Sequence, residues 1–141
     1  MYKRVFLDTN VIADLHDVNR PFNKESIKAM EILFREENTE IYTSCDVITT
    51  LYYILSKINK KKALDIIEEV NEWCSVIEFA NKEIQECCML MKENAKYKDL
   101  EDTIQYVMAK KMNCDLILSN DKGFVSDEIP LMSTEAYLSS L

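Results

Sequence analysis

Two short apolar runs in the sequence are each followed at once by side chains that can bind a metal ion or move a proton. The runs and their polar followers are 5–7 with Asp8 and Asn10, and 116–118 with Ser119 and Asp121. Runs this short and this apolar are typical of strands buried on both faces of a parallel sheet. Ligands of such sheets bind beyond the carboxyl ends of the strands, so these side chains are expected to meet at one edge.

Further acidic residues fall at the expected starts of two helices. Asp99, Glu101 and Asp102 open the helix that leads into the second apolar run, and Asp99 and Asp102 share a helix face. Asp46 and Thr50 lie one turn apart at the start of the helix after the second strand. Each acid also has an ordinary alternative role, because Asp at a helix start caps backbone N–H groups and Asp near Gly favours a turn.

The acidic residues together favour one kind of chemistry. Carboxylates gathered at one point repel each other unless a cation compensates them or one of them holds a proton. Oxygen ligands without His or Cys favour hard ions such as Mg²⁺ or Mn²⁺. Such ions activate water and neutralise the charge that develops on phosphate during hydrolysis. The pattern indicates an acidic metal site, but spacing alone does not separate it from independent capping and turn roles.

The elements that must position these residues follow from apolar periodicity. Strands are expected at 5–7, 41–43, 76–79, 116–118 and 129–132. Helices are expected at 11–15, 23–36, from 44 or 46 to 57, 60–73, 81–94, 100–112, and from 133 or 134 to 138. Phe34, Leu64, Ile84 and Leu100 occur at helical core spacing and are expected to face inward. Strands that alternate with helices predict a parallel α/β sandwich, with Pro130 restricting the last strand to an edge.

Composition sets further limits. The 141 residues fit one domain, 1–141, and 48% hydrophobic with 30% charged residues is an ordinary globular balance. Gly123 is the only glycine, which excludes phosphate loops that need several glycines at fixed offsets. The net charge of −8 argues against a bulk electrostatic grip on nucleic acid. Bound metal can still reverse the sign of charge locally.

The five cysteines, together with the absence of certain segments, indicate where the protein works. No CxxC pair or histidine cluster accompanies the cysteines, so they are expected to be mostly buried, reduced thiols in a reducing cytoplasm. The N-terminal apolar run is too short for a signal peptide. No apolar run is long enough to cross a membrane, and no membrane partner is expected.

Several segments together resemble the motifs of PIN-domain ribonucleases, in order and spacing, over essentially the whole chain. They are Val5-Phe6-Leu7-Asp8-Thr9-Asn10-Val11, Leu100-Glu101-Asp102-Thr103-Ile104-Gln105-Tyr106 followed by Ala109, Ile117-Leu118-Ser119-Asn120-Asp121-Lys122-Gly123-Phe124, and Ile129-Pro130-Leu131-Met132-Ser133. The resemblance implies a three-layer α/β/α sandwich with a central parallel sheet. It also implies Mg²⁺- or Mn²⁺-dependent cleavage of RNA. Many bacterial members are toxins of toxin–antitoxin pairs and are often dimeric, so an antitoxin and a homodimer are expected partners.

The resemblance also assigns roles by position. The metal-binding carboxylates would be Asp8, Asp102 and Asp121. Asn10 and Ser119 would shape the site, and Asp99 would either add an acidic ligand or cap its helix.

The sequence departs from the family pattern at one position of the site. The family usually has a Glu early in the helix after the second strand, and this chain has Thr50 there. A hydroxyl supplies no charge, so Asp46, one turn earlier, or a water molecule would have to complete the site. The alternative hypothesis is therefore a catalytically weakened PIN-like module that binds RNA or a protein partner without efficient cleavage.

Overall fold

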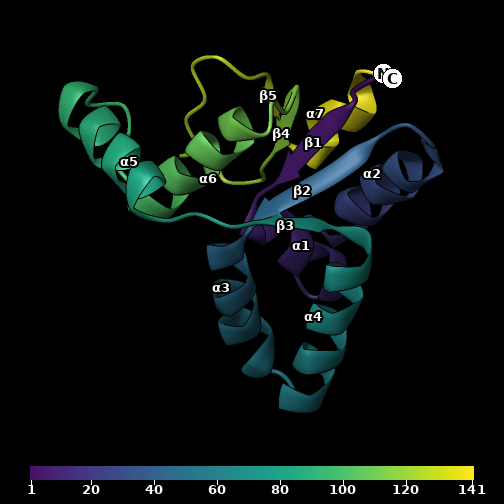
Figure 1. Cartoon of the computed structure of the whole chain (residues 1–141). Coiled ribbons are helices and arrows are strands. Elements are labelled where there is room, and N and C mark those ends of the chain that lie inside the picture. The colour runs from purple at the N-terminus through teal and green to yellow at the C-terminus, as the bar shows by residue number, and fades with distance from the viewer.

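The central sheet has five strands in the order β3-β2-β1-β4-β5, and every neighbouring pair is parallel. The computed structural model describes all 141 residues (Figure 1). Its strands are β1 (Arg4–Leu7), β2 (Glu40–Ser44), β3 (Ser75–Ile77), β4 (Leu116–Leu118) and β5 (Leu131–Met132). Its helices are α1 (Thr9–His16), α2 (Asn23–Arg35), α3 (Cys45–Ser56), α4 (Lys60–Trp73), α5 (Asn81–Glu93), α6 (Leu100–Lys111) and α7 (Thr134–Ser139).

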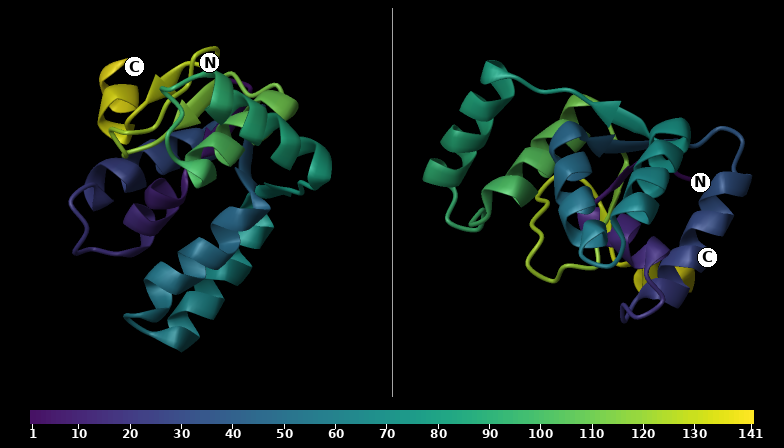
Figure 2. Two further views of the ribbon diagram at one scale, coloured as in Figure 1. Left: turned by 90° about the vertical axis from the view of Figure 1, so that its left-hand side faces the viewer. Right: turned by 90° about the horizontal axis from the view of Figure 1, so that it is seen from below.

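The middle strands are buried on both faces because their side chains alternate between two separate cores. Val5 and Leu7 of β1 belong to a core shared with α1, α2, α3, α4 and α7. Phe6, between them, belongs to a second core shared with α5 and α6. Figure 2 shows these helix layers on opposite sides of the sheet. The expected three-layer α/β/α sandwich with a parallel sheet is confirmed.

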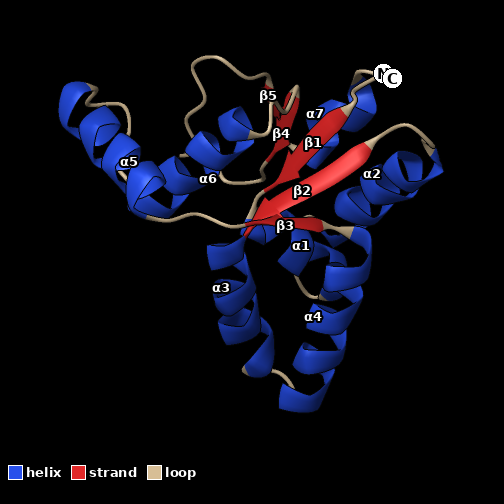
Figure 3. Cartoon of the chain, in the orientation of Figure 1, coloured by secondary structure: helices blue, strands red, loops and turns tan.

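Register in the sheet brings the carboxyl ends of the central strands together. Leu7 at the end of β1 pairs with Leu118 at the end of β4, and the Asp8 N–H donates to the Leu118 carbonyl at 3.0 Å. Helices α1 and α3 begin directly after β1 and β2, so they start at this same edge (Figure 3). The edge therefore collects the residues that follow three different strands.

Some sequence expectations about packing are wrong in detail. Phe34, Leu64, Ile84 and Leu100 are each about half exposed instead of facing the core. The Phe34 ring instead packs edge-on against Trp73, with centroids 5.2 Å apart. Helical spacing identifies a face of a helix but not how wide a stripe the neighbouring elements cover, and α5 contacts mainly α6.

Two smaller expectations also change. The last strand is limited to Leu131–Met132, because the preceding segment with Pro130 is irregular, although the strand does lie at the predicted edge of the sheet. All five cysteines are free thiols, but Cys88 is exposed and Cys45 only partly buried, so burial holds for three of the five.

Hydropathy of the helices gives one further finding. None of the helices is both long enough and apolar enough to cross a membrane.

Candidate active site

Asp8 is the most deeply buried carboxylate at the carboxyl edge of the sheet, with 3% of its surface exposed. Its side chain makes no capping hydrogen bond to α1. Instead, Oδ2 accepts hydrogen bonds from the Ser119 Oγ at 2.7 Å and the Asn10 Nδ2 at 2.9 Å. The structure therefore joins the followers of β1 and β4 in direct contact, as the sequence predicts.

Burial and neighbouring charge change the acidity of Asp8. Desolvation raises its pKa to about 6, the Asp121 charge adds to the rise, and the hydrogen bond from Ser119 opposes it. The Gln105 side chain of α6 also lies close enough to the carboxylate to lower its pKa. Gln105 is 1% exposed, and its Oε1 has no hydrogen-bond partner. The sequence analysis missed this residue, which lies one turn after Glu101 on the same helix face.

Asp102 lies on the first turn of α6, close enough to Asp8 for the charge of Asp8 to raise its pKa. Its pKa is raised to about 7, first by desolvation and then by the negative charges of Asp8, Asp99, Asp121 and Glu101. Asp8, Asp102 and Asp121 therefore lie at one edge of the sheet and act on each other, which is the grouping that the sequence predicts. No three Asp, Glu, His or Cys side chains are close enough together to hold one ion directly.

Asp99 and Asp121 have the ordinary structural roles that sequence reasoning left open. Asp99 is the N-cap of α6, and its Oδ1 accepts the Asp102 N–H at 2.9 Å. The Asp121 Oδ1 accepts the Gly123 N–H at 2.8 Å in the turn after β4. Both residues are exposed at the edge. A capping or turn role leaves one oxygen of each carboxylate without these bonds, so it does not exclude a role in the site.

Asp46 occupies the first turn of α3, as predicted. Its Oδ1 accepts a hydrogen bond from the Ser44 hydroxyl, whereas its Oδ2 is buried without a partner. Desolvation raises its pKa, and the bond from Ser44 opposes that rise. Thr50, one turn later, interacts with the Glu101 carboxylate of α6.

Glu101 is an acidic residue of this edge that the sequence analysis placed in a cluster but assigned no role. The Thr9 Oγ1 donates to the Glu101 Oε1 at 3.4 Å. Desolvation and the Asp46 charge raise the pKa of Glu101, and the hydroxyls of Thr50 and Thr9 lower it. Its position next to Asp102 was the available signal, but its contacts span α1, α3 and α6.

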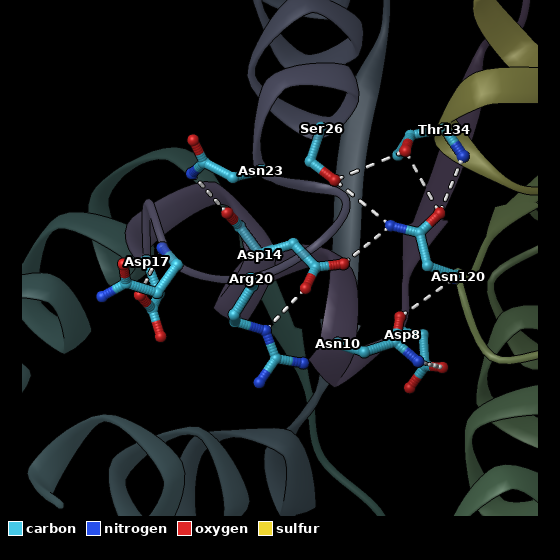
Figure 4. A network of polar contacts seen from close by, with 10 residues as sticks. Asp8, Asn10, Asp14, Asp17, Arg20, Asn23, Ser26, Asn120 and Thr134 are labelled. Atoms are coloured by element: carbon cyan, nitrogen blue, oxygen red, sulfur yellow. Dashed lines mark hydrogen bonds and ion pairs between the residues drawn. The ribbon is translucent and has the colours of Figure 1, made fainter. Parts of the chain in front are cut away.

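Asn120 organises the loop between Ser119 and Asp121, and the sequence analysis missed it as well. Figure 4 shows its amide at the centre of a polar network. The amide Nδ2 donates to the Asp14 Oδ2 at 2.8 Å and to the Ser26 Oγ at 3.2 Å. The Oδ1 accepts from the Thr134 N–H and hydroxyl, at 3.0 and 3.1 Å.

The same network is connected to Asp8, at the carboxyl edge of the sheet, through the backbone N–H of Asn120. It also includes an ion pair. The Asn120 N–H donates to the Asn10 Oδ1 at 3.0 Å, and the other amide group of Asn10 bonds Asp8. The Arg20 Nε lies 2.6 Å from the Asp14 Oδ1, so this buried carboxylate is neutralised (Figure 4). Asn10 therefore shapes the site as predicted, by bridging Asp8 and the β4 loop.

The acids of the edge have no basic partners. The five ion pairs of the chain are Arg4–Glu40, Arg20–Asp14, Lys96–Asp127, Lys110–Glu128 and Lys111–Glu83. None includes Asp8, Asp46, Asp99, Glu101, Asp102 or Asp121. Grouped carboxylates without a Lys or Arg partner suit a hard cation in charge and in ligand type. Because Mg²⁺ keeps several of its waters, it can be held by few direct carboxylate contacts.

A five-stranded parallel sheet covered by helices on both faces, with acidic residues at its carboxyl edge, defines a three-layer α/β/α protein with a carboxylate-rich candidate site. The chain belongs to the PIN domain family, whose sequence pattern matches residues 5–126. It is 47% identical over 135 residues to Ribonuclease VapC1 of Aquifex aeolicus (strain VF5), covering 96% of this chain and 93% of that protein.

Solved structures share the fold at lower identity. The VapBC2 structure from Rickettsia felis, bound to a DNA fragment from its promoter, aligns with a TM-score of 0.71 at 18% identity, covering 92% of this chain and 98% of that one. VapC20 of Mycobacterium tuberculosis, a Sarcin-Ricin loop cleaving toxin, aligns with a TM-score of 0.69 at 14% identity, covering 87% and 98%. These likenesses establish the fold.

Proposed function

We propose that this protein is a metal-dependent endoribonuclease that acts as the toxin of a toxin–antitoxin pair. The observation that carries the proposal is the convergence of Asp8, Asp102 and Asp121 on one edge of the sheet without a Lys or Arg partner. Membership of the PIN domain family and the relative named Ribonuclease VapC1 support the same activity.

Asp8, Asp102 and Asp121 are the residues that would hold Mg²⁺ or Mn²⁺, with Asp99 as a further oxygen ligand at the rim. A bound ion of this kind activates water and neutralises charge on the phosphate. The raised pKa values of Asp8 and Asp102 record the cost of ionising buried carboxylates, and neighbouring negative charges add to that cost. A cation lowers that cost, which is the physical reason why this edge favours one.

The remaining steps, orienting the carboxylates and transferring a proton, fall to side chains of the protein. Ser119 and Asn10 fix the orientation of the Asp8 carboxylate through two hydrogen bonds to Oδ2. Asp102 is only partly buried and its pKa is raised to about 7, so its carboxylate is suited to accept a proton from an attacking water. Hydrolysis adds that water to phosphorus and breaks a phosphorus–oxygen bond of the RNA backbone.

The proposal extends to partners and to the compartment. An antitoxin protein and a second copy of this chain are the proposed protein partners, and one structural neighbour, from Klebsiella pneumoniae, is named as a toxin–antitoxin complex. Five free cysteines support a reducing cytoplasm as the place of action.

Cleavage of a labelled RNA by the purified protein tests this function. We expect cleavage with Mg²⁺ or Mn²⁺ and none in EDTA. Asp8→Asn and Asp121→Asn should each lower the rate by at least about a hundredfold, because each removes a charge that the site needs. Asp65→Asn, an exposed change on α4, serves as the matched control and should cleave like the wild type. Equal cleavage in EDTA would show that the mechanism is wrong.

A second candidate function is RNA or protein binding without efficient turnover. The neutral Thr50, at the position where the family usually has Glu, favours it. Titrating Mn²⁺ against the wild type and Thr50→Glu separates the two functions. A strong gain of cleavage in the variant would support the weakened module, whereas robust wild-type cleavage would remove it.

A further inference from the structure

Glu101 has a position that helix stability alone does not explain. An acid in the first turn of a helix interacts favourably with the helix dipole from any exposed position. Glu101 is instead partly buried, and its Oε1 accepts a hydrogen bond from Thr9 of α1 at 3.4 Å. The Thr50 hydroxyl of α3 also lies close enough to lower the pKa of this carboxylate. Neutral donors therefore hold the carboxylate between three helices, and no Lys or Arg forms an ion pair with it.

The two residues of the Thr9–Glu101 contact are each adjacent in the chain to a proposed metal-binding carboxylate. Thr9 follows Asp8 in the chain, and Glu101 precedes Asp102. The Thr9–Glu101 bond therefore ties the segment that carries Asp8 to the segment that carries Asp102. Asp46 and Thr50, both of α3, are among the groups that act on Glu101, so its carboxylate lies toward α3.

A second, independent feature of the same helix face points to a missing partner. Gln105 follows Glu101 by one turn, is 1% exposed, and lies close enough to the Asp8 carboxylate to lower its pKa. The other end of its amide, Oε1, has no hydrogen-bond partner in the structure. Buried polar atoms are almost always satisfied, so an orphaned acceptor on the residue one turn after Glu101 indicates a ligand such as a cation or its bound water.

We propose that Glu101, held by the hydroxyls of Thr9 and Thr50, is a further cation-binding carboxylate of this site and supplies its negative charge on the α3 side. This inference rests on the proposed metal dependence and adds a residue to it. Asp46 is the alternative acid for this role, since its Oδ2 is also buried without a partner. Glu101 is the better candidate because it adjoins Asp102 in the chain and its carboxylate contacts Thr9, the residue after Asp8.

Mn²⁺ binding without RNA tests the inference, measured by calorimetry on the full chain. Glu101→Gln keeps the size of the side chain and should weaken Mn²⁺ binding about tenfold or more. Asp46→Asn should weaken it less. Glu93→Gln, an exposed change at the end of α5, is the control for loss of one charge and should bind as the wild type does. Circular dichroism of each metal-free variant checks that it is folded.

Moving the negative charge from α6 to α3 by mutation makes the test specific to this position. Thr50 contacts Glu101, so a Glu at position 50 would place its carboxylate in the same space. The double variant Thr50→Glu/Glu101→Gln should therefore recover most of the affinity that Glu101→Gln loses. Wild-type affinity in Glu101→Gln, or a larger loss in Asp46→Asn, would overturn the assignment of Glu101 while leaving the metal site intact. A wild-type protein that binds no Mn²⁺ would instead overturn the proposed function and this inference with it.

Discussion

The pKa values of the carboxylates Asp8 and Asp102 are set first by burial, because no basic side chain forms an ion pair with either of them. Asp8 illustrates the effect, since desolvation is the largest cause of its pKa of about 6, and the ordinary value is 3.8. Hydrogen bonds from neutral donors reduce the rise but do not cancel it. In the absence of a cation, the site therefore stores unfavourable electrostatic energy in the folded state.

The cost of ionising buried Asp8 predicts that the free energy of unfolding depends on pH. The folded pKa of Asp8 is above its unfolded value, so folding favours the protonated acid, and stability falls as the pH rises from about 4 to about 6. A shift of this size corresponds to at most about 3 kcal/mol. In EDTA, Asp8→Asn should be more stable than the wild type at pH 7.5, with little difference at pH 4. Urea unfolding measures this, and a variant that is less stable at pH 7.5 contradicts the account.

Gly123 is important for space, not for backbone conformation. No glycine of the chain has a positive φ, and a Cβ on Gly123 would lie 3.3 Å from the Asp121 Oδ1. Gly123→Ala should therefore shift the Asp121 carboxylate slightly and lower the cleavage rate roughly threefold. The free energy of unfolding should change by less than about 1 kcal/mol. Steady-state cleavage together with urea unfolding distinguishes this outcome from general destabilisation, which would change the second measurement first.

Hydrogen bonds between side chains, as well as the sheet, fix how the helices are positioned at the carboxyl edge of the sheet. Asn120, just after β4, bonds Asp14 of α1, Ser26 of α2 and Thr134 of α7. These helices pack on one face of the sheet (Figure 2). The network therefore sets where the β4 loop lies relative to Asp8.

Removing the amide tests this role. Asn120→Ala leaves a buried carboxylate oxygen and two hydroxyls short of a partner, so it should destabilise the fold by about 2–4 kcal/mol. Cleavage should also fall at a temperature where the variant is folded, because the neighbouring Ser119 and Asp121 lose their support. The exposed Asn19→Ala is the matched control. Equal stability of the two variants in urea would show that the network contributes little.

The molecule as a whole carries a net charge of −8, and its acids gather where the proposed substrate must bind. RNA binding should therefore depend on divalent cations more than on surface lysines. We expect weak binding of a short labelled RNA in EDTA and at least about tenfold tighter binding when Ca²⁺, a hard ion with oxygen ligands, is added. The affinity in Ca²⁺ should fall only shallowly with NaCl concentration, as expected for about two or three phosphate contacts. Fluorescence anisotropy measures both. Tight binding in EDTA with a steep salt dependence would instead indicate a basic surface as the main contact.

The sequence by itself determined the buried strands, the helix starts and the polar residues that follow the strands, because these depend on short stretches of sequence. Apolar triplets such as 116–118 identify buried parallel strands, and the polar residues after them must lie at the carboxyl edge, so the grouping of Asp8 with Asp121 follows from topology. The position of Asp99 at the start of a helix also follows from the sequence, and its N-cap bond is one of the two roles that the sequence left open. Pro130 likewise placed the last strand at the edge of the sheet.

Only the tertiary structure decided which residues from distant segments touch. Thr9 and Glu101 are 92 positions apart, and Asn120 and Asp14 are 106 apart. Neither pair has a periodic or composition signal, because their contacts depend on how α1, α3 and α6 pack around the ends of β1 and β4. The exposure of Phe34 and Leu64 was missed for the same reason. Periodicity gives the direction of a side chain on its own helix, whereas burial depends on whether another element covers that direction.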